Sequence, residues 1–306
     1  MPLVFSIHAG EAFSSELNGI RRVGELYIGN PSASRIGHCL SLSASASAKI
    51  VSKRERVRIS CLDALIDLCW AARAGIAGEE SAEELIYRIV APVHGSRSIP
   101  VESWMEAYPQ LYSLEALERV GIVSSLNGVY RAGLIDEVAA ICAAGGTVDR
   151  ALGSLAYALS PPISGADLHI PLRGALLDRY VRFSVDVSES ARLLALTEVR
   201  ESGTTIEACP TSNIVLSGLD GYSAHPLWSW LDDGVDVSVS SDDPLMFNSS
   251  VGGEFRFLQN AKPARADLLA QAAAVSVGSC TQGERRGLSE VRSLRSRLRL
   301  SSDGAE

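Results

Sequence analysis

The sequence lacks the features that mark membrane-spanning or disulfide-stabilised secreted proteins. No segment approaches the roughly 18 uninterrupted apolar residues that a membrane helix needs. The six cysteines include no CxxC pair, and we expect them to be reduced, small hydrophobic core residues. Strand-like residues follow Met1 directly, without a basic segment or a cleavage site. We therefore expect no secretion signal and a cytoplasmic location.

Positive charge is also in short supply. The formal net charge is -8, from 28 Lys and Arg against 36 Asp and Glu, which argues against a general nucleic-acid-binding surface. Hydrophobic residues make up 46% and charged residues 21% of the chain, as in a soluble globular protein. The 306 residues suffice for one large domain or two ordinary ones.

Chemically active residues follow two strand-like runs, the first of which is apolar. The run from Leu3 to Ile7 predicts a short buried strand, and His8 and Glu11 come directly after it. The run from Val235 to Val239 predicts another strand, which leads into Asp242-Asp243. Parallel α/β folds place their chemistry at the carboxyl ends of strands. These four side chains are therefore candidates for a hydrolytic metal site.

Each of these motifs also fits an ordinary structural role when it is taken alone. The pair His8 and Glu11 fits a helix start with a capping glutamate, and Asp-Asp-Pro is common turn chemistry. His38, which follows Gly37, is either a catalytic base or a buried core histidine. Cys209 opens a polar loop that ends at Asn213, and no positive neighbour is visible to lower its pKa. We expect this cysteine to be structural.

The pattern of expected strands and helices divides the chain into three regions. Residues 1–48 and 189–306 alternate strands with helices, whereas residues 49–188 are rich in helical patterns. The expected strands lie near 3–7, 34–37, 204–209 and 235–240. A single βα unit takes roughly 30 residues, and the interval from His38 to Cys209 is several times longer. We interpret the middle region as an inserted helical subdomain.

Within the middle region, the apolar spacing predicts helices over Cys61–Ala74 and Ala82–Val90. The segment Ile122–Tyr130, with Asn-Gly at its centre, fits a β-hairpin or a helix-turn-helix equally well. Apolar residues alternate from Val181 to Val187 like those of a half-buried strand. The serine- and alanine-rich segment Ser41–Ser52 is either a linker or a weak helix.

Helix signals return after the middle region. Ser190 is a good N-cap for a helix that ends near Glu201, with Gly203 as the stop signal. His225-Pro226 is expected to open a short helix. Two closing helices are expected over Ala264–Ser279 and Leu288–Leu298.

Four motifs in this order resemble those of the adenosine deaminase family, within the metal-dependent amidohydrolases. The family carries His-Ala-Gly-Glu after strand five, Gly-His after strand six, Cys-Pro-x-Ser-Asn after strand seven and Asp-Asp after strand eight. The matching positions here are His8 to Glu11, Gly37-His38, Cys209 to Asn213 and Asp242-Asp243. The resemblance covers about 1–45 and 188–280. It implies an α/β fold, a partial (β/α)8 TIM-type barrel of strands five to eight with a helical insertion.

The resemblance also implies a function, that of a zinc-dependent hydrolytic deaminase of adenosine or a related purine. His8 and Asp242 would be zinc ligands, and Asp242 would also hold the zinc-bound water. Glu11 would protonate the purine ring nitrogen N1 as water attacks C6. His38 would orient or deprotonate the zinc-bound water.

The substrate side of the implied site consists of Gly10 and Asp243, and Asp243 would hydrogen-bond the purine nitrogen N7. Adenosine, adenine, AMP and a modified nucleoside all fit the residues that are visible. Neither a nucleic-acid duplex nor a membrane is expected as a partner.

One family motif has no counterpart in these 306 residues. The family's first strand carries a His-x-His pair that supplies two more zinc ligands, and the other histidines here, at 94, 169 and 225, form no such pair. Catalytic zinc sites use at least three protein ligands. We therefore expect only part of the catalytic unit, completed by a separate chain with the first half-barrel or by a homo-oligomer. The alternative is a catalytically inactive purine-binding or scaffold protein.

Overall fold

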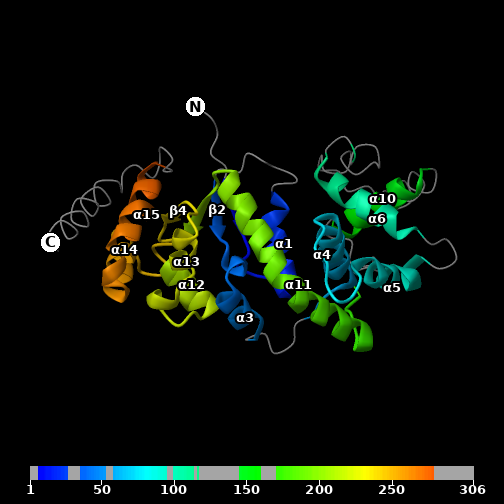
Figure 1. Ribbon diagram of the computed structural model, residues 1–306, viewed down its shortest axis with the longest axis horizontal. Helices are drawn as coiled ribbons and strands as arrows, with labels where there is room; N and C mark the ends of the chain where they lie inside the picture. Colours follow the sequence, from blue (N-terminus) through cyan, green and yellow to red (C-terminus); the bar gives the residue numbers. More distant parts are fainter. Residues whose placement is uncertain are drawn as a thin grey trace. The chain divides into compact units, whose positions relative to one another are not determined.

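The computed structural model describes residues 6–26, 35–52, 58–94, 99–113, 116, 145–159 and 170–278. The chain divides into two compact units (Figure 1). One unit comprises Met1–Glu55 with Arg192–Glu306, and the other comprises Arg56–Ala191. The interpretation of the middle region as an insertion, with limits at 48 and 188, stays a prediction.

A four-stranded parallel sheet forms the centre of the first unit. Its strands are β1 (Ser6–Ala9), β2 (Arg35–His38), β3 (Thr205–Ala208) and β4 (Val237–Val239), and they lie side by side in this order. All three neighbouring pairs are parallel. The prediction of an α/β fold with a parallel sheet is confirmed. The expected strand over 3–7 lies partly outside the described residues.

The two faces of this sheet differ in chemistry. The register aligns one apolar row across the four strands, Ile7, Ile36, Ile206 and Val237. The adjacent row, which faces the other side, consists of His8, Gly37, Glu207 and Ser238. Parallel strands are generally apolar on both faces, so the polar face is an exception, and it carries His8.

Helices of the first unit pack their apolar sides against this sheet or against one another. Helix α1 begins after Ser15, whose hydroxyl accepts a hydrogen bond from the Asn18 amide at 3.1 Å. Helices α14 and α15, drawn in orange in Figure 1, lie beside β4. The helices of this unit are α1 (Glu16–Gly24), α3 (Ala44–Ser52), α12 (Pro210–Ser217), α13 (Leu227–Asp232), α14 (Val251–Ala261) and α15 (Ala266–Gly278).

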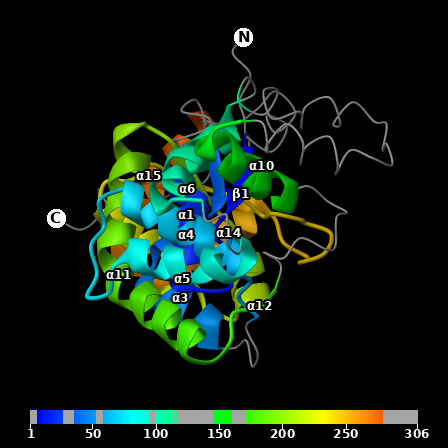
Figure 2. The same cartoon turned by 90° about the vertical axis from the view of Figure 1, so that its right-hand side faces the viewer.

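The second unit is helical in its described part. Figure 2 shows α4, α5 and α6 lying together, and all three pairs of these helices are in contact. A core of large side chains joins the helices, with Trp104, Tyr108 and Leu65 fully buried. The helices are α4 (Cys61–Arg73), α5 (Ala82–His94), α6 (Val101–Ala107), α10 (Thr147–Leu159) and the first part of α11 (Gly174–Glu201).

Helix α11 corrects two expectations. The segment from Val181 to Val187 is helical rather than a strand, and the helix does not begin at Ser190. Its alternating apolar residues form two pairs four residues apart. Phe183 and Val187 are buried, whereas Val181 and Val185 are exposed. Apolar residues spaced by two therefore cover two sides of a helix, and only one of these sides is buried.

Other sequence expectations have mixed outcomes. Helix α11 ends at Glu201, as predicted, and Gly203 just after it adopts a left-handed φ of 67°. The segment Ser41–Ser52 contains helix α3, so the helical alternative is correct. The expected short helix begins at Leu227, with Pro226 as its N-cap residue. The expected polar loop after Cys209 is instead the start of helix α12, and neither α12 nor α14 was predicted. The segments Ile122–Tyr130 and Leu288–Leu298 lie outside the described residues.

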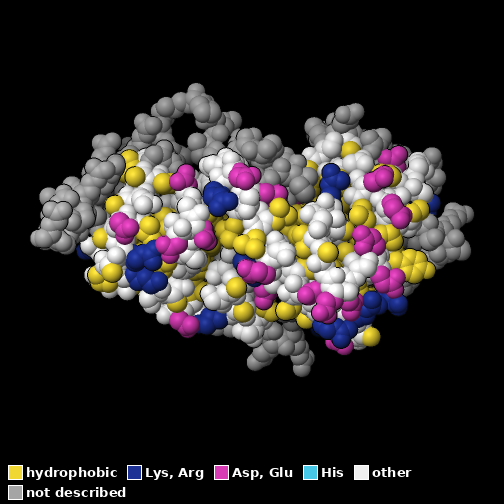
Figure 3. Space-filling model, in the orientation of Figure 1, with side chains coloured by type: hydrophobic (Ala, Val, Ile, Leu, Met, Phe, Trp, Pro, Cys, Tyr) yellow, Lys and Arg dark blue, Asp and Glu magenta, His cyan; other side chains and the backbone are white. Residues whose placement is uncertain are grey.

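The described surface carries charged side chains of both signs (Figure 3), as the composition leads us to expect. In Figure 3, acidic and basic side chains are interspersed over the face shown. In the described part of the chain, no helix has both the length and the apolar character needed to cross a membrane.

Candidate active site

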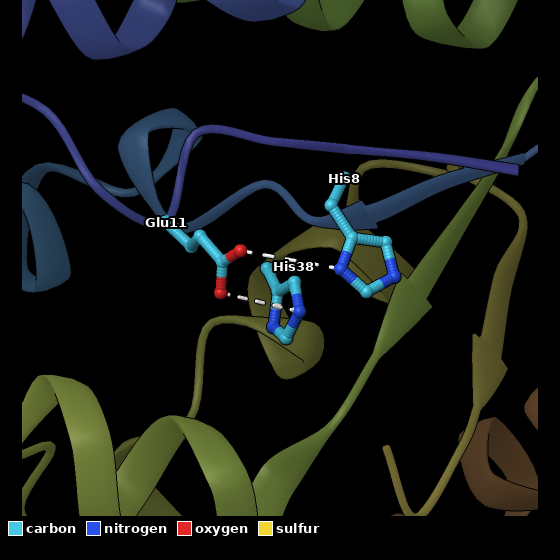
Figure 4. A group of neighbouring side chains, drawn as sticks. All are labelled: His8, Glu11 and His38. Carbon is cyan, nitrogen blue, oxygen red and sulfur yellow. Dashed lines mark ion pairs between the residues drawn. The ribbon is translucent and has the colours of Figure 1, made fainter. Parts of the chain in front are cut away.

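Two histidines and a glutamate meet at the carboxyl ends of β1 and β2 (Figure 4). The Glu11 side chain points toward both rings: its Oε2 lies 3.2 Å from His38 Nε2, and its Oε1 lies 4.0 Å from His8 Nδ1. The rings are packed edge to face, with centroids 4.8 Å apart and planes at 81°. His8 is largely exposed, whereas His38 is buried. The cluster therefore combines a solvent-facing imidazole with one that the protein holds fixed.

Two glycines make this arrangement sterically possible. A Cβ atom on Gly37 would lie 2.6 Å from His8 Cδ2, so the His8 ring occupies the space that a side chain would take. Gly10 has a left-handed φ of 70°, and a Cβ there would collide with Ser41 Oγ. The tight turn at Gly10 carries the chain from His8 to Glu11. These contacts explain why the motif needs glycine at both positions.

His38 is held from behind by a buried chain of polar groups. Its backbone adopts a left-handed φ of 68°, so β2 ends sharply at this residue. His38 Nδ1 lies 2.8 Å from the Asn213 carboxamide, and the other end of that carboxamide lies 2.9 Å from His225 Nε2. The Leu227 amide donates to His225 Nδ1 at 3.1 Å. Burial, and then the neighbouring His38, lower the pKa of His225 to about 3.

Asp242 follows β4 and also lies close to His38. It adopts a left-handed φ of 57°, and the Ser212 hydroxyl donates to its Oδ2 at 2.7 Å. Ligand atoms of Asp242, His38 and Cys209 all lie within 4.8 Å of one another. A carboxylate oriented by a hydroxyl donor is well prepared to bind a cation, because its free lone pairs have fixed directions.

Asp243 shows the turn chemistry that the sequence left open. Its Oδ1 accepts hydrogen bonds from the amides of Leu245 and Met246, both at 3.0 Å. These bonds hold the loop after Asp242. The neighbouring Leu245 side chain is 94% exposed, so this loop presents apolar surface as well as the Asp243 carboxylate.

Cys209 does not have the environment of a nucleophile. Burial raises the pKa of its thiol, and nearby carboxylates, Glu207 first, raise it further. The protonated thiol is a poor nucleophile and a poor metal ligand. The described cysteines Cys39, Cys61, Cys69 and Cys209 are all free of disulfides.

The predicted site residues fall into two overlapping groups. The structure brings His8, Glu11 and His38 together, and it brings His38 and Asp242 together with Cys209. Among the described residues, His8 and Asp242 belong to different groups that share His38. Gly10 and Asp243 flank these groups in the loops after β1 and β4. The donor set is imidazole nitrogen and carboxylate oxygen, which suits a zinc-type cation.

Sequence reasoning assigned no role to four polar residues that support the site. Ser212 and Asn213 were visible within a quoted motif, and His225 beside a helix signal, but none had a stated partner. Glu254 is fully buried in the first turn of α14, where its Oε2 accepts from the Thr211 amide at 3.1 Å. This carboxylate stabilises the N-terminal turn of α12. Its role depends on a tertiary contact that no local sequence pattern shows.

The fold and the cluster define the class of protein. It is an α/β protein whose parallel strands present imidazole and carboxylate groups at their carboxyl ends, the arrangement of a candidate hydrolytic metal site. Residues 181–291 match the family model described as adenosine deaminase. This match supports membership of the adenosine deaminase family.

Relatives of known activity align with parts of the chain. An adenosine deaminase of Plasmodium knowlesi is 39% identical over 74 residues, covering 24% of this chain and 20% of the relative. An adenine deaminase of Agrobacterium fabrum is 35% identical over 115 residues, covering 37% of this chain and 34% of the relative. An adenosine deaminase of Shewanella denitrificans is 42% identical over 55 residues, covering 18% and 17%. The aligned regions thus span no more than about a third of these relatives.

Proposed function

We propose that this protein is a hydrolytic deaminase of adenosine or a related purine. One observation carries the proposal: the Glu11 carboxylate lies 3.2 Å from the buried ring of His38 and 4.0 Å from His8, at the ends of adjacent parallel strands. A carboxyl group beside two imidazoles can move a proton while a water molecule is held in place. The relatives are adenosine and adenine deaminases, which supports a purine as the substrate.

The proposed cofactor is zinc, held by His8 and Asp242. Bound zinc lowers the pKa of water to about 7 and so supplies a nucleophile at neutral pH. These two residues offer one nitrogen and one carboxylate oxygen, which are ligands that zinc takes. Two protein ligands are fewer than the three that catalytic zinc sites use, so further ligands must complete the site.

The remaining residues bind the purine and move protons. Glu11 gives a proton to N1 of the ring as the oxygen of water bonds to C6. One proton of that water passes to the exocyclic amino group, which leaves as ammonia, and the other restores the Glu11 acid. His38 faces the same space and orients the attacking water. Asp243 contacts N7, and Gly10 contacts the purine from the loop after β1.

We also propose that β1 to β4 are strands five to eight of a TIM-type barrel, with the helical unit as an insertion. The parallel order of the strands and the polar face of the sheet support this proposal. The first four strands, with a His-x-His pair, would come from polypeptide outside these 306 residues. A second copy of this sequence cannot supply that pair, because its five histidines contain none.

The decisive experiment measures ammonia release and zinc content together. The purified chain is assayed with adenosine and with adenine, alone and after addition of a polypeptide that carries the first four barrel strands of a deaminase. We expect weak zinc binding and poor turnover from the chain alone, and recovery of both in the mixture. Absence of deamination despite full zinc occupancy in the mixture would refute the function. Robust turnover by the chain alone would refute only the need for completion.

Three variants of the completed enzyme separate the proposed roles. Glu11→Gln removes the proton donor, so turnover should fall by about 100-fold or more while zinc stays bound. Asp242→Ala should lower zinc content and turnover together. Asp243→Asn should mainly raise KM. The assignment fails if Glu11→Gln lowers the zinc content after dialysis and Asp242→Ala leaves it unchanged.

A further inference from the structure

The buried hydrogen bonds that connect His38, Asn213 and His225 each have a donor and an acceptor, and the Leu227 amide determines which atom is which. The Leu227 backbone amide lies 3.1 Å from His225 Nδ1. A backbone N–H can only donate a hydrogen bond. The Nδ1 atom of His225 must therefore accept, which means that it carries no proton.

The other ring nitrogen of His225 must then be a donor. His225 is buried, and burial lowers its pKa to about 3, so the ring is neutral at physiological pH. A neutral imidazole has one protonated nitrogen and one bare nitrogen. Since Nδ1 is bare, Nε2 carries the proton and donates toward Asn213, 2.9 Å away.

The carboxamide of Asn213 has one accepting end and one donating end. If it accepts from His225, its other end must donate to His38. The heavy atoms place Oδ1 2.8 Å from His38 Nδ1 and Nδ2 2.9 Å from His225 Nε2. In that orientation both nitrogens of His225 would have to accept, which only an imidazolate can do. A half-turn of the carboxamide exchanges two ends of equal shape and satisfies all three groups.

We propose that Asn213 and His225 are positioning residues that keep His38 in the neutral tautomer with its proton on Nε2. In this arrangement the Asn213 amino group donates to His38 Nδ1. The His38 Nε2–H then donates to Glu11 Oε2, 3.2 Å away. We call the hydrogen-bonded series His225, Asn213, His38 and Glu11 the relay. It runs from the start of α13 to the end of β2, and all of its side chains except Glu11 are buried.

The consequence for catalysis rests on the proposed deaminase function. His38 presents an N–H, not a lone pair, to the space beside Glu11. When it is not paired with Glu11, this N–H can donate a hydrogen bond to the attacking water and orient it, but His38 has no lone pair on Nε2 to take the proton of that water. Asp242, which lies in one cluster with His38, is left as the acceptor of that proton.

The test reads the tautomer directly and needs no substrate. The full chain is labelled with 15N-histidine, and its ring nitrogens are observed by NMR, in solution or in the solid state if the chain associates. A His38→Gln variant identifies the His38 signals. We expect Nε2 of His38 and Nε2 of His225 to be protonated, and both Nδ1 atoms to be bare. A proton on Nδ1 of either ring in the unmodified chain would overturn the proposal.

The variant Asn213→Asp provides the matched perturbation. A carboxylate accepts from both rings, so the proton of His38 should move to Nδ1 while His225 keeps its tautomer. Thr211→Val is the control, because Thr211 lies in the same helix as Asn213 but its hydroxyl pairs with Tyr222 outside that helix, so the change leaves the relay intact. An unchanged His38 signal in Asn213→Asp, with unchanged tryptophan fluorescence, would contradict the proposal.

A kinetic measurement separates this proposal from the proposed function. In the completed enzyme, Asn213→Asp should lower kcat by about 100-fold with zinc content and KM close to those of the Thr211→Val control. A kcat equal to that of the control would overturn the catalytic role of the relay. If the tautomers are as expected but the unmodified completed enzyme releases no ammonia, the deaminase function fails and the relay stands.

Discussion

Replacing Gly37 by alanine should damage the site while leaving the fold nearly intact. The added Cβ would lie 2.6 Å from His8 Cδ2, whereas carbon atoms in contact prefer about 3.5–4.0 Å. The His8 ring must therefore move by roughly 1 Å or change its rotamer. Its side chain is 51% exposed, so the ring can swing into solvent and the backbone of β2 need not move.

Gly37→Ala should lower the free energy of unfolding only slightly but should lower zinc affinity and turnover strongly. The displaced ring loses its edge-to-face contact with His38, which has a centroid distance of 4.8 Å and contributes about 0.5–1.5 kcal/mol at most. We expect the free energy of unfolding to fall by about 1 kcal/mol or less. A misplacement of a ligand by about 1 Å can cost roughly 100-fold in rate. The loss in zinc affinity and turnover should therefore far exceed the loss in stability.

The assay compares Gly37→Ala with Gly146→Ala in the completed enzyme. A Cβ on Gly146 meets no atom within 4 Å, so this control reports the effect of a glycine-to-alanine change alone. Urea unfolding gives the stability, and zinc titration and ammonia release give the function. The reasoning is refuted if Gly37→Ala retains the zinc affinity and turnover of the control, or if it unfolds the chain.

Two further predictions concern the groups around Asp242 and His38. Ser212→Ala removes the donor 2.7 Å from Asp242 Oδ2 and should weaken zinc binding by about 10–100-fold, while Ser217→Ala should have no effect; equal affinities in the two variants would contradict this role. Because burial lowers the pKa of His225 in the folded chain from 6.5 to about 3, the unfolded chain binds more protons between these values. Stability should be unaffected by this group above about pH 6.5 and should fall as the pH drops below it, by up to about 1.4 kcal/mol per pH unit. Urea titrations at pH 7 and pH 5 should show a smaller loss for His225→Asn than for the unmodified chain, and equal losses would contradict this account.

The sheet was predictable from the sequence because a polar motif marks the end of each strand, and two of the four expected strands, at 3–7 and 235–239, are strand-like runs. The strands β2, β3 and β4 begin and end within two residues of their expected positions. Alternation alone was a weaker signal. It predicted a strand over Val181–Val187, where the long helix α11 uses the same residues on two sides.

The candidate site was predictable only for residues that act at strand ends. His8, Glu11 and His38 were expected to meet because parallel strands end at the same edge of a sheet, and the structure brings them together. The partner of His38 was not predictable, since Asn213 is 175 positions away along the chain. That contact depends on how α12 begins after β3, which is a tertiary property.

The chemistry of the sheet explains why the proposed barrel must be completed by a polar surface. On the face that carries His8, Arg35 and Glu207 form a buried ion pair at 3.2 Å, and the buried Ser238 hydroxyl has no hydrogen-bond partner among the described residues. An apolar surface packed against this face would leave the Ser238 hydroxyl unpaired, at a cost of about 1–3 kcal/mol. Strands that present polar side chains to a shared interior could offer it a hydrogen-bond partner. The sheet face that carries His8 would therefore pack better against strands with polar side chains than against an apolar helix.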